Sequence, residues 1–247
     1  VSNAGSTVVY NQTGGSQTAL GLIYGGALTL SGTSTKNLSA AASVAGTFSH
    51  SVGALTVDQN LTISSATPSF ATIADVSAGR TLTLSGTGAK SITTVTSTNA
   101  TGAIANTGVS GLLTVGTLSD NLGSITGGAG GLTFTSGATN HGTITGGAGA
   151  VTFSSTLAQA GGTITAGAGT IAFNGIVTQT GGSMASAALA NALDFNANVA
   201  NSAGTIDLTV TGSAQFAGSV NAGGLNFANG TTVTYTGAGQ TVADVNY

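Results

Sequence analysis

The sequence predicts an all-β solenoid, in which short strands wind into about ten stacked coils. Two observations predict this fold: apolar-polar-apolar triplets recur at a nearly constant spacing, and glycine clusters separate them. Charged residues make up only 4% of the 247 positions, which bears on function. A right-handed parallel β-helix is the favoured form. A β-sandwich with donated strands is the alternative, and it would not account for the regular spacing.

The clearest repeat is a triplet whose first and third residues are apolar. Alternation of this kind is typical of a strand with one buried face. The third residues are 19 to 22 positions apart, which predicts coils of 19–22 residues from about residue 113 onward. We expect them to stack as an inward core ladder, aromatic over most of its length. The ladder comprises Val115, Phe134, Phe153, Phe173, Phe195, Phe216 and Tyr235.

Two further columns repeat in step with this ladder, as stacked coils require. Glycine clusters between the triplets supply the corners that join the strands. The second column comprises Ile125, Ile144, Ile164, Met184, Ile206 and Phe227. The third comprises Ala138, Leu157, Val177, Val199 and Val220.

The amino-terminal half shows a longer spacing. Leu28, Leu55 and Leu82 each begin an apolar triplet and lie 27 residues apart. This spacing predicts one solenoid domain over residues 27–247, with coils of about 27 residues over 27–112 and shorter coils over 113–247. Residues 1–26 are predicted to form an amino-terminal strand, a cap or an assembly segment.

One phrase recurs almost unchanged. Leu-Thr-Leu-Ser-Gly-Thr begins at Leu28 and again at Leu82, and each copy is followed by a lysine, Lys36 or Lys90. The interpretation is a solvated turn copied by duplication, with the two lysines in equivalent places.

The charged inventory excludes several functions. Three cations cannot form the basic stripe that nucleic-acid binding needs. No apolar run is long enough for a transmembrane helix, and the absence of cysteine excludes disulfides and thiolate metal sites. The acids are scattered, and the nearest pair, Asp194 and Asp207, should lie on different walls facing water. We therefore expect no catalytic site, no metal site and no cofactor, with His50 and His141 on the surface or at corners.

The repeats resemble the passenger repeats of autotransporters and filamentous-haemagglutinin-type surface proteins of bacteria. Leu-Thr-Phe-Thr-Ser-Gly from Leu132 and Gly-Gly-Thr-Ile-Thr-Ala-Gly-Ala-Gly from Gly161 carry the resemblance, which covers roughly Ala27 to Tyr247. It implies secretion and a structural or adhesive role at the surface of a Gram-negative-type bacterium. The uncharged start, Val1 to Ser6, is interpreted as a mature end left by signal removal, or as a trimmed chain.

The two ends suggest a function. Open solenoid ends present unpaired strand edges, which soluble proteins normally protect with charge or a cap. Few charges flank the strand-like runs near the termini, which predicts head-to-tail assembly of identical copies into an extracellular filament or surface layer. The residues expected at this interface are Val8, Val9, Tyr10, Val233, Tyr235, Val242 and Tyr247.

Two other functions stay open. A monomeric adhesin would bind a glycan or a host surface and needs exposed aromatic rings, for which Tyr24 and Tyr247 are candidates. An ice-binding solenoid would use a flat array of outward hydroxyl side chains. The candidate array comprises Ser124, Thr126, Thr143, Thr145, Thr163 and Thr165.

Overall fold

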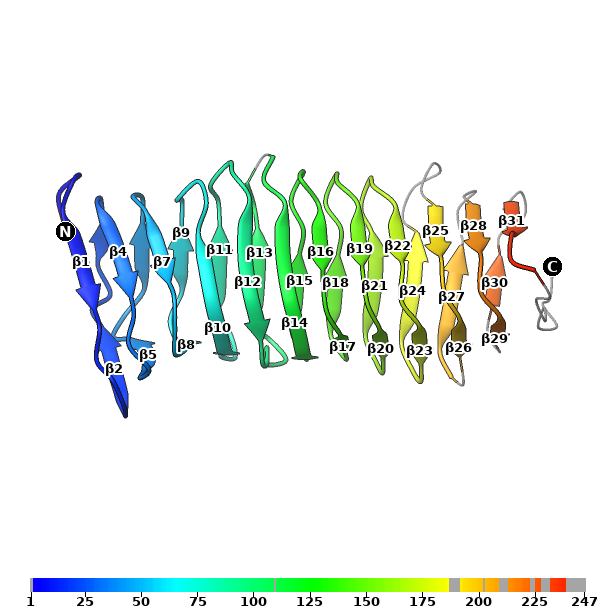
Figure 1. Ribbon diagram of the computed structural model, residues 1–247, viewed down its shortest axis with the longest axis horizontal. Coiled ribbons are helices and arrows are strands. Elements are labelled where there is room, and N and C mark those ends of the chain that lie inside the picture. Colours follow the sequence, from blue (N-terminus) through cyan, green and yellow to red (C-terminus); the bar gives the residue numbers. More distant parts are fainter. Residues whose placement is uncertain are drawn as a thin grey trace.

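A computed structural model of the chain describes residues 2–108, 110–186, 192–201, 203–208, 213–222, 225–227 and 232–238. These residues form a parallel β-solenoid of about ten turns, as predicted, with no helix among them. The coils stack along one axis, with the amino-terminal and carboxyl-terminal strands at opposite ends (Figure 1). Within the described residues, no helix has the length and apolar character that crossing a bilayer requires.

Each coil has three walls. Wall 1 is the run that begins at the amino-terminal edge strand and contains the predicted core ladder. Its strands are β1 (Thr7–Tyr10), β4 (Ala27–Leu30), β7 (Phe48–His50), β10 (Ser69–Val76), β12 (Lys90–Val95), β14 (Leu113–Asn121), β16 (Leu132–Phe134), β19 (Val151–Phe153), β22 (Ile171–Phe173), β25 (Ala192–Phe195), β28 (Ser213–Phe216) and β31 (Thr232–Tyr235).

Wall 2 follows wall 1 around a corner, except where β10, β12 and β14 run through both walls. Its separate strands are β2 (Ser16–Ala19), β5 (Thr35–Leu38), β8 (Ala54–Val57), β17 (Ala138–Asn140), β20 (Leu157–Gln159), β23 (Val177–Gln179), β26 (Val199–Asn201) and β29 (Val220–Ala222).

Wall 3 is a separate sheet of parallel strands. It contains β3 (Ile23–Tyr24), β6 (Ala42–Val44), β9 (Leu61–Ile63), β11 (Thr81–Leu84), β13 (Ala103–Asn106), β15 (Ser124–Thr126), β18 (Thr143–Thr145), β21 (Thr163–Ala166), β24 (Ser183–Ser186), β27 (Thr205–Leu208) and β30 (Leu225–Phe227).

The predicted core ladder is confirmed. Its members pair in register from Val115 onward, and its phenylalanines are buried. The rings of Phe173 and Phe195 are nearly parallel, with centroids 4.6 Å apart, and the neighbouring rings stack in the same way. The spacing follows from the strand separation of about 4.8 Å in a parallel sheet. Alternation within each triplet therefore fixes which residues form the core.

The predicted 27-residue coils are wrong. Leu28 pairs with Phe48, and His50 pairs with Phe70, so early coils advance by twenty residues like the later ones. Leu28, Leu55 and Leu82 lie on β4, β8 and β11, which belong to walls 1, 2 and 3. Each step of 27 residues is therefore one coil plus one wall. Residues before 27 are continuous with this stack, since β1 pairs with β4 and β2 with β5.

One member of the second column is also wrong. Ile206 pairs with Leu225, and Phe227 is the partner of Leu208. A shift by two residues keeps the same side chains on the same face of a strand. Hydrophobic alternation alone therefore cannot detect this error. Ala138, Leu157, Val177, Val199 and Val220, the third column, pair as predicted.

Corners require glycine where the next coil crosses close by. Gly162 has a positive φ of 58°, and a Cβ on it would lie 1.9 Å from the carbonyl oxygen of Gly142 in the preceding coil. Gly182 repeats the arrangement one coil later, with φ 67°. Glycine at these corners therefore serves both the turn and the tight stacking of backbones.

Candidate functional site

β1 is the first wall 1 strand among the described residues, and it pairs on one side only. β1 pairs with β4 on one side, and no described strand pairs with its other side. Val8 and Tyr10 point inward but are only partly buried, whereas Leu28 and Leu30, their partners in the next coil, are 1% and 0% exposed. Side chains at these two inward positions are thus fully buried inside the rod and only partly buried on β1. Val9, between them, points outward and is 50% exposed.

Two tyrosine hydroxyls organise this first coil. The Tyr10 and Tyr24 hydroxyls are 3.3 Å apart, and the Tyr10 hydroxyl accepts a hydrogen bond from the backbone N–H of Leu20. The Tyr24 hydroxyl donates to the Leu20 carbonyl. Burial and the neighbouring Tyr10 raise the pKa of Tyr24. The predicted exposed aromatic at Tyr24 is therefore wrong: the ring is 1% exposed and fills the inside of the coil.

β31, the last described strand of wall 1, repeats this arrangement. Val233 and Tyr235 on β31 are partly buried and pack against the core, and the Tyr235 ring stacks on Phe216 with centroids 5.6 Å apart. No described strand pairs with the outer side of β31. The two inward columns of wall 1 thus begin with Val8 and Tyr10. Among the described residues they end with Val233 and Tyr235. Two further predicted interface residues, Val242 and Tyr247, lie outside the described residues.

The two repeated lysines are buried, so the prediction of a solvated turn is wrong. Lys36 is 0% exposed, and its ammonium donates to the Ser34 hydroxyl, to the Ser34 carbonyl at 3.2 Å and to the Gln12 carbonyl at 3.4 Å. Lys90 donates to the carbonyls of Gly86 and Gly88 at 2.5 and 2.9 Å. Burial lowers the pKa of both lysines.

The repeated phrase therefore forms a strand, a corner and the start of the next strand. Its lysine supplies the hydrogen-bond donor for the backbone carbonyls of that corner. The lysine is the first inward residue after the corner and turns back to bind corner carbonyls. The two copies differ in place, because Lys36 follows the corner into wall 2 and Lys90 follows the corner into wall 1. Among the described residues, neither ammonium has a carboxylate partner. Their role is to satisfy buried carbonyls, which would otherwise destabilise the corner.

The prediction that His50 lies on the surface or at a corner is wrong, because its side chain is an inward residue of strand β7 and is 1% exposed. It stands in wall 1 between Leu30 and Phe70, and neither ring nitrogen has a hydrogen-bond partner of good geometry. Burial, and secondarily the charge of Lys36, lower the pKa of His50 to about 4; a backbone group of Val52 opposes the shift only in part. The ring is therefore neutral at pH 7.

Replacing His50 with phenylalanine should stabilise the fold by about 1–3 kcal/mol at pH 7, because it removes buried polar atoms that lack partners. The parent should also lose about 3 kcal/mol between pH 6.5 and pH 4, where the unfolded chain binds a proton that the folded chain does not. Urea unfolding at several pH values measures both effects. His141→Phe, a change at an exposed histidine, is the control and should keep the acid-dependent loss; an equal loss in His50→Phe would contradict this account.

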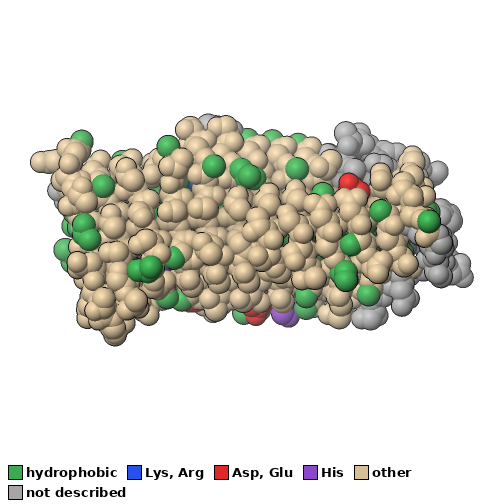
Figure 2. Space-filling model, viewed as in Figure 1, with side chains coloured by type: hydrophobic (Ala, Val, Ile, Leu, Met, Phe, Trp, Pro, Cys, Tyr) green, Lys and Arg blue, Asp and Glu red, His purple; other side chains and the backbone are tan. Residues whose placement is uncertain are grey.

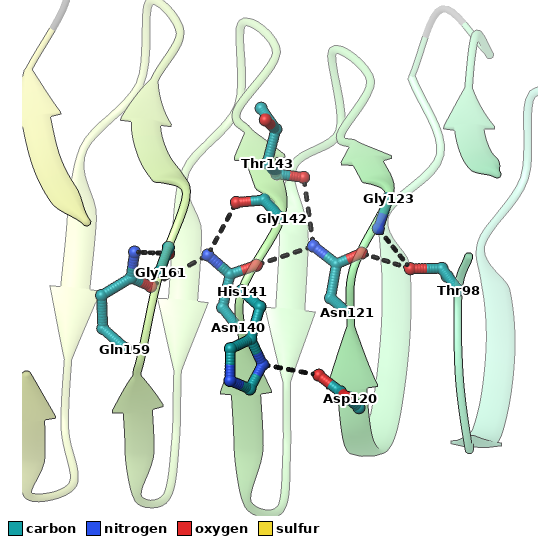
Figure 3. A network of polar contacts seen from close by, with 10 residues as sticks. All are labelled: Thr98, Asp120, Asn121, Gly123, Asn140, His141, Gly142, Thr143, Gln159 and Gly161. Carbon is teal, nitrogen blue, oxygen red and sulfur yellow. Dashed lines mark hydrogen bonds and ion pairs between the residues drawn. The ribbon is translucent and has the colours of Figure 1, made fainter. Parts of the chain in front are cut away.

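A ladder of buried amides joins several coils in the middle of the rod, and sequence reasoning missed it. Asn121 donates to Asn140 at 2.7 Å, and Asn140 donates to Gln159 at 2.9 Å (Figure 3). Thr98 begins the ladder by donating to Asn121 at 2.6 Å. These side chains end wall 2 of successive coils and are 0% exposed. The amides also bind corner carbonyls, such as Gly142 and Gly161.

Two acidic groups, Asp120 and Asp75, make contacts that stabilise the fold. His141 and Asp120 form an exposed pair at 2.8 Å, so the predicted surface position of His141 is confirmed. Asp75 accepts hydrogen bonds from Ser77, Ser97 and Asn99. Within the described part of the chain, no three metal-ligating side chains gather. Few charged side chains are visible on the face shown in Figure 2, and an acidic side chain there lies beside a histidine.

The hydroxyl array of wall 3 is aligned as predicted. Ser124, Thr143 and Thr163 are successive partners, and Thr126, Thr145 and Thr165 form the second column. The array is interrupted by alanine at Ala103 and Ala105 on β13, next to Thr81 and Thr83 on β11. The regular hydroxyl surface thus covers only part of this wall.

Comparisons with protein-family models, with curated proteins and with solved structures gave no match to the chain. The fold is compatible with β-helix repeat proteins in general. The autotransporter and haemagglutinin resemblance rests on the repeats alone.

Proposed function

We propose that the protein is a secreted structural subunit that assembles head to tail into an extracellular filament or surface layer. The observation that carries this proposal is the pair of partly open core positions at each end of wall 1: Val8 and Tyr10 on β1, Val233 and Tyr235 on β31. Covering them with a second copy would bury apolar surface and satisfy two rows of backbone groups. Both gains favour association of opposite ends.

The adhesin alternative has less support. Glycan binding commonly uses an exposed aromatic ring. The exposed large apolar side chains of the described residues are aliphatic, and Tyr10 and Tyr235 are partly buried. Ice binding would draw on the aligned hydroxyls of wall 3, which alanine interrupts on β13. The partly buried core residues on β1 and β31 therefore support the filament proposal more specifically than any feature supports the two alternatives.

The test is electron microscopy of the purified protein over a concentration series, together with a variant blocked at one end. The parent should form uniform filaments, and Val233→Lys should leave single rods on the order of 50 Å long, because it places an ammonium in the junction. Thr234→Lys is the matched control: it places the same charge on the outward face of the same strand and should assemble.

Thermal unfolding checks that both variants keep the parent fold. Val233 is already partly solvated, so we expect little change in the unfolding midpoint. Single rods of the parent at every concentration would overturn the proposal. Filaments of Val233→Lys as abundant as those of Thr234→Lys would remove β31 from the interface.

A further inference from the structure

We infer that the junction between copies has one register, in which β31 of one copy pairs in parallel with β1 of the next so that Thr232 faces Thr7 and Tyr235 faces Tyr10. This inference rests on the proposed function and specifies its interface. The partner is a second copy of this chain, and the residues in contact lie on the two edge strands of wall 1.

The first support is that β1 and β31 belong to the same wall. Pairing runs without a break from β1 through β4 and β7 along the rod to β28 and β31. Every step in this series is parallel and in register. A second copy placed on the same axis would therefore bring its β1 to the position where the next wall 1 strand belongs.

The second support is the sequence of the two edge strands. β1 reads Thr-Val-Val-Tyr from Thr7, and β31 reads Thr-Val-Thr-Tyr from Thr232. Both show the same alternation of exposed and partly buried positions. Wall 1 carries an aliphatic residue and then a large side chain at the two inward positions of most coils. The proposed register continues this order across the junction, with valine on valine and tyrosine on tyrosine.

The third support is the geometry of the aromatic column. Tyr235 stacks on Phe216, and Tyr10 occupies the same inward position of wall 1 at the other end of the rod. The proposed register would place Tyr10 of the next copy in line with this column. The hydrogen bonds of the Tyr10 hydroxyl to Tyr24 and Leu20 already fix its ring. Less side-chain freedom is then lost when the copies associate.

The register also sets polarity. Contact between the end carrying β1 and the end carrying β31 is heterologous, so each added copy leaves the same two ends exposed and growth continues. Contact between two β1 edges would instead set the strands antiparallel and stop at a dimer.

Cysteine cross-linking tests this register in a chain that has no cysteine of its own. Val9 and Thr234 both point outward, and the proposed register places them directly opposite, about 4.8 Å apart at Cα. That separation allows a disulfide. After oxidation, Val9→Cys/Thr234→Cys should give a ladder of covalent multimers containing the 9–234 cross-link. Val9→Cys/Thr232→Cys, displaced by two residues, is the control and should give no such ladder, because its Cα atoms lie beyond about 7 Å.

The possible outcomes distinguish failure of the register from failure of the filament proposal. Filaments with the 9–234 link support the register, and Thr7→Cys/Thr232→Cys should then link as well. Filaments of the reduced variants that form no 9–234 link, or prefer the 9–232 link, overturn the register while the filament proposal stands. Links of 9 to 9 or 234 to 234 in dimers indicate antiparallel ends and overturn it too. Single rods in the parent and in all variants overturn the filament proposal and the register together.

Discussion

Replacing Phe173 with alanine should destabilise the solenoid by about 3–5 kcal/mol. The ring is 0% exposed and stacks on Phe153 and Phe195 on its two sides, with centroids 5.3 and 4.6 Å away. Loss of the ring would open a cavity in the middle of the aromatic column, because parallel strands at fixed spacing cannot collapse into it. Urea unfolding measures the change in the free energy of unfolding.

A pair of leucine substitutions separates stacking from cavity formation. Phe173→Leu loses two ring contacts, whereas Phe134→Leu loses one, since Phe134 has Val115 on its other side. We expect Phe173→Leu to be less stable than Phe134→Leu by about 0.5–1.5 kcal/mol. Equal losses in the two variants would mean that the rings contribute only by volume.

Replacing Asn140 with aspartate should be about as damaging at neutral pH, at about 3–5 kcal/mol, although the two side chains have nearly the same shape. Asn140 is buried and donates to the Gln159 side-chain oxygen at 2.9 Å and to the Gly142 carbonyl at 3.1 Å. An aspartate would place a negative charge against these two acceptors, and in the described part of the chain the hydrogen bonds of Asn140 join it only to uncharged groups. Asn140→Leu, which removes the hydrogen bonds without adding charge, should cost less.

The pH dependence identifies the cause. Burial and the two acceptors should raise the folded-state pKa of the new aspartate above its unfolded value of about 3.9. The folded chain would then bind the proton first, so the deficit of Asn140→Asp relative to the parent should shrink as the pH falls toward 4. Comparison at each pH cancels the His50 contribution. A deficit independent of pH would mean that lost donors, and not charge, cause the instability.

The sequence predicted the fold because apolar alternation repeated in step. Phe134, Phe153 and Phe173 needed only a period of two within strands and a constant spacing between coils. The 27-residue interpretation failed because Leu28, Leu55 and Leu82 carry the same local pattern on three different walls. A single triplet does not identify its wall; only the strand pairing does.

A hydrophobic pattern could not predict which polar side chains are buried. Lys36, Lys90 and His50 occupy inward positions, whereas reasoning from polarity places such residues in water. The sequence did contain a signal for the amide ladder, because Asn121, Asn140 and Gln159 recur at the coil spacing. Asn140 and Gln159 are paired in neighbouring strands of wall 2. The partners of the lysines are backbone carbonyls of corners, and no side-chain pattern reports those.

Because the coils stack in register, the length of the rod depends on the number of coils. Val151 and Ile171 hold the same place in successive coils, so deleting residues 151–170 would splice one coil out and leave every column aligned. The rod would become shorter by one strand spacing, about 4.8 Å. Deleting half a coil would instead bring one wall onto another and set the amides against the phenylalanines. Length in this architecture can therefore change by whole coils, with both ends unchanged.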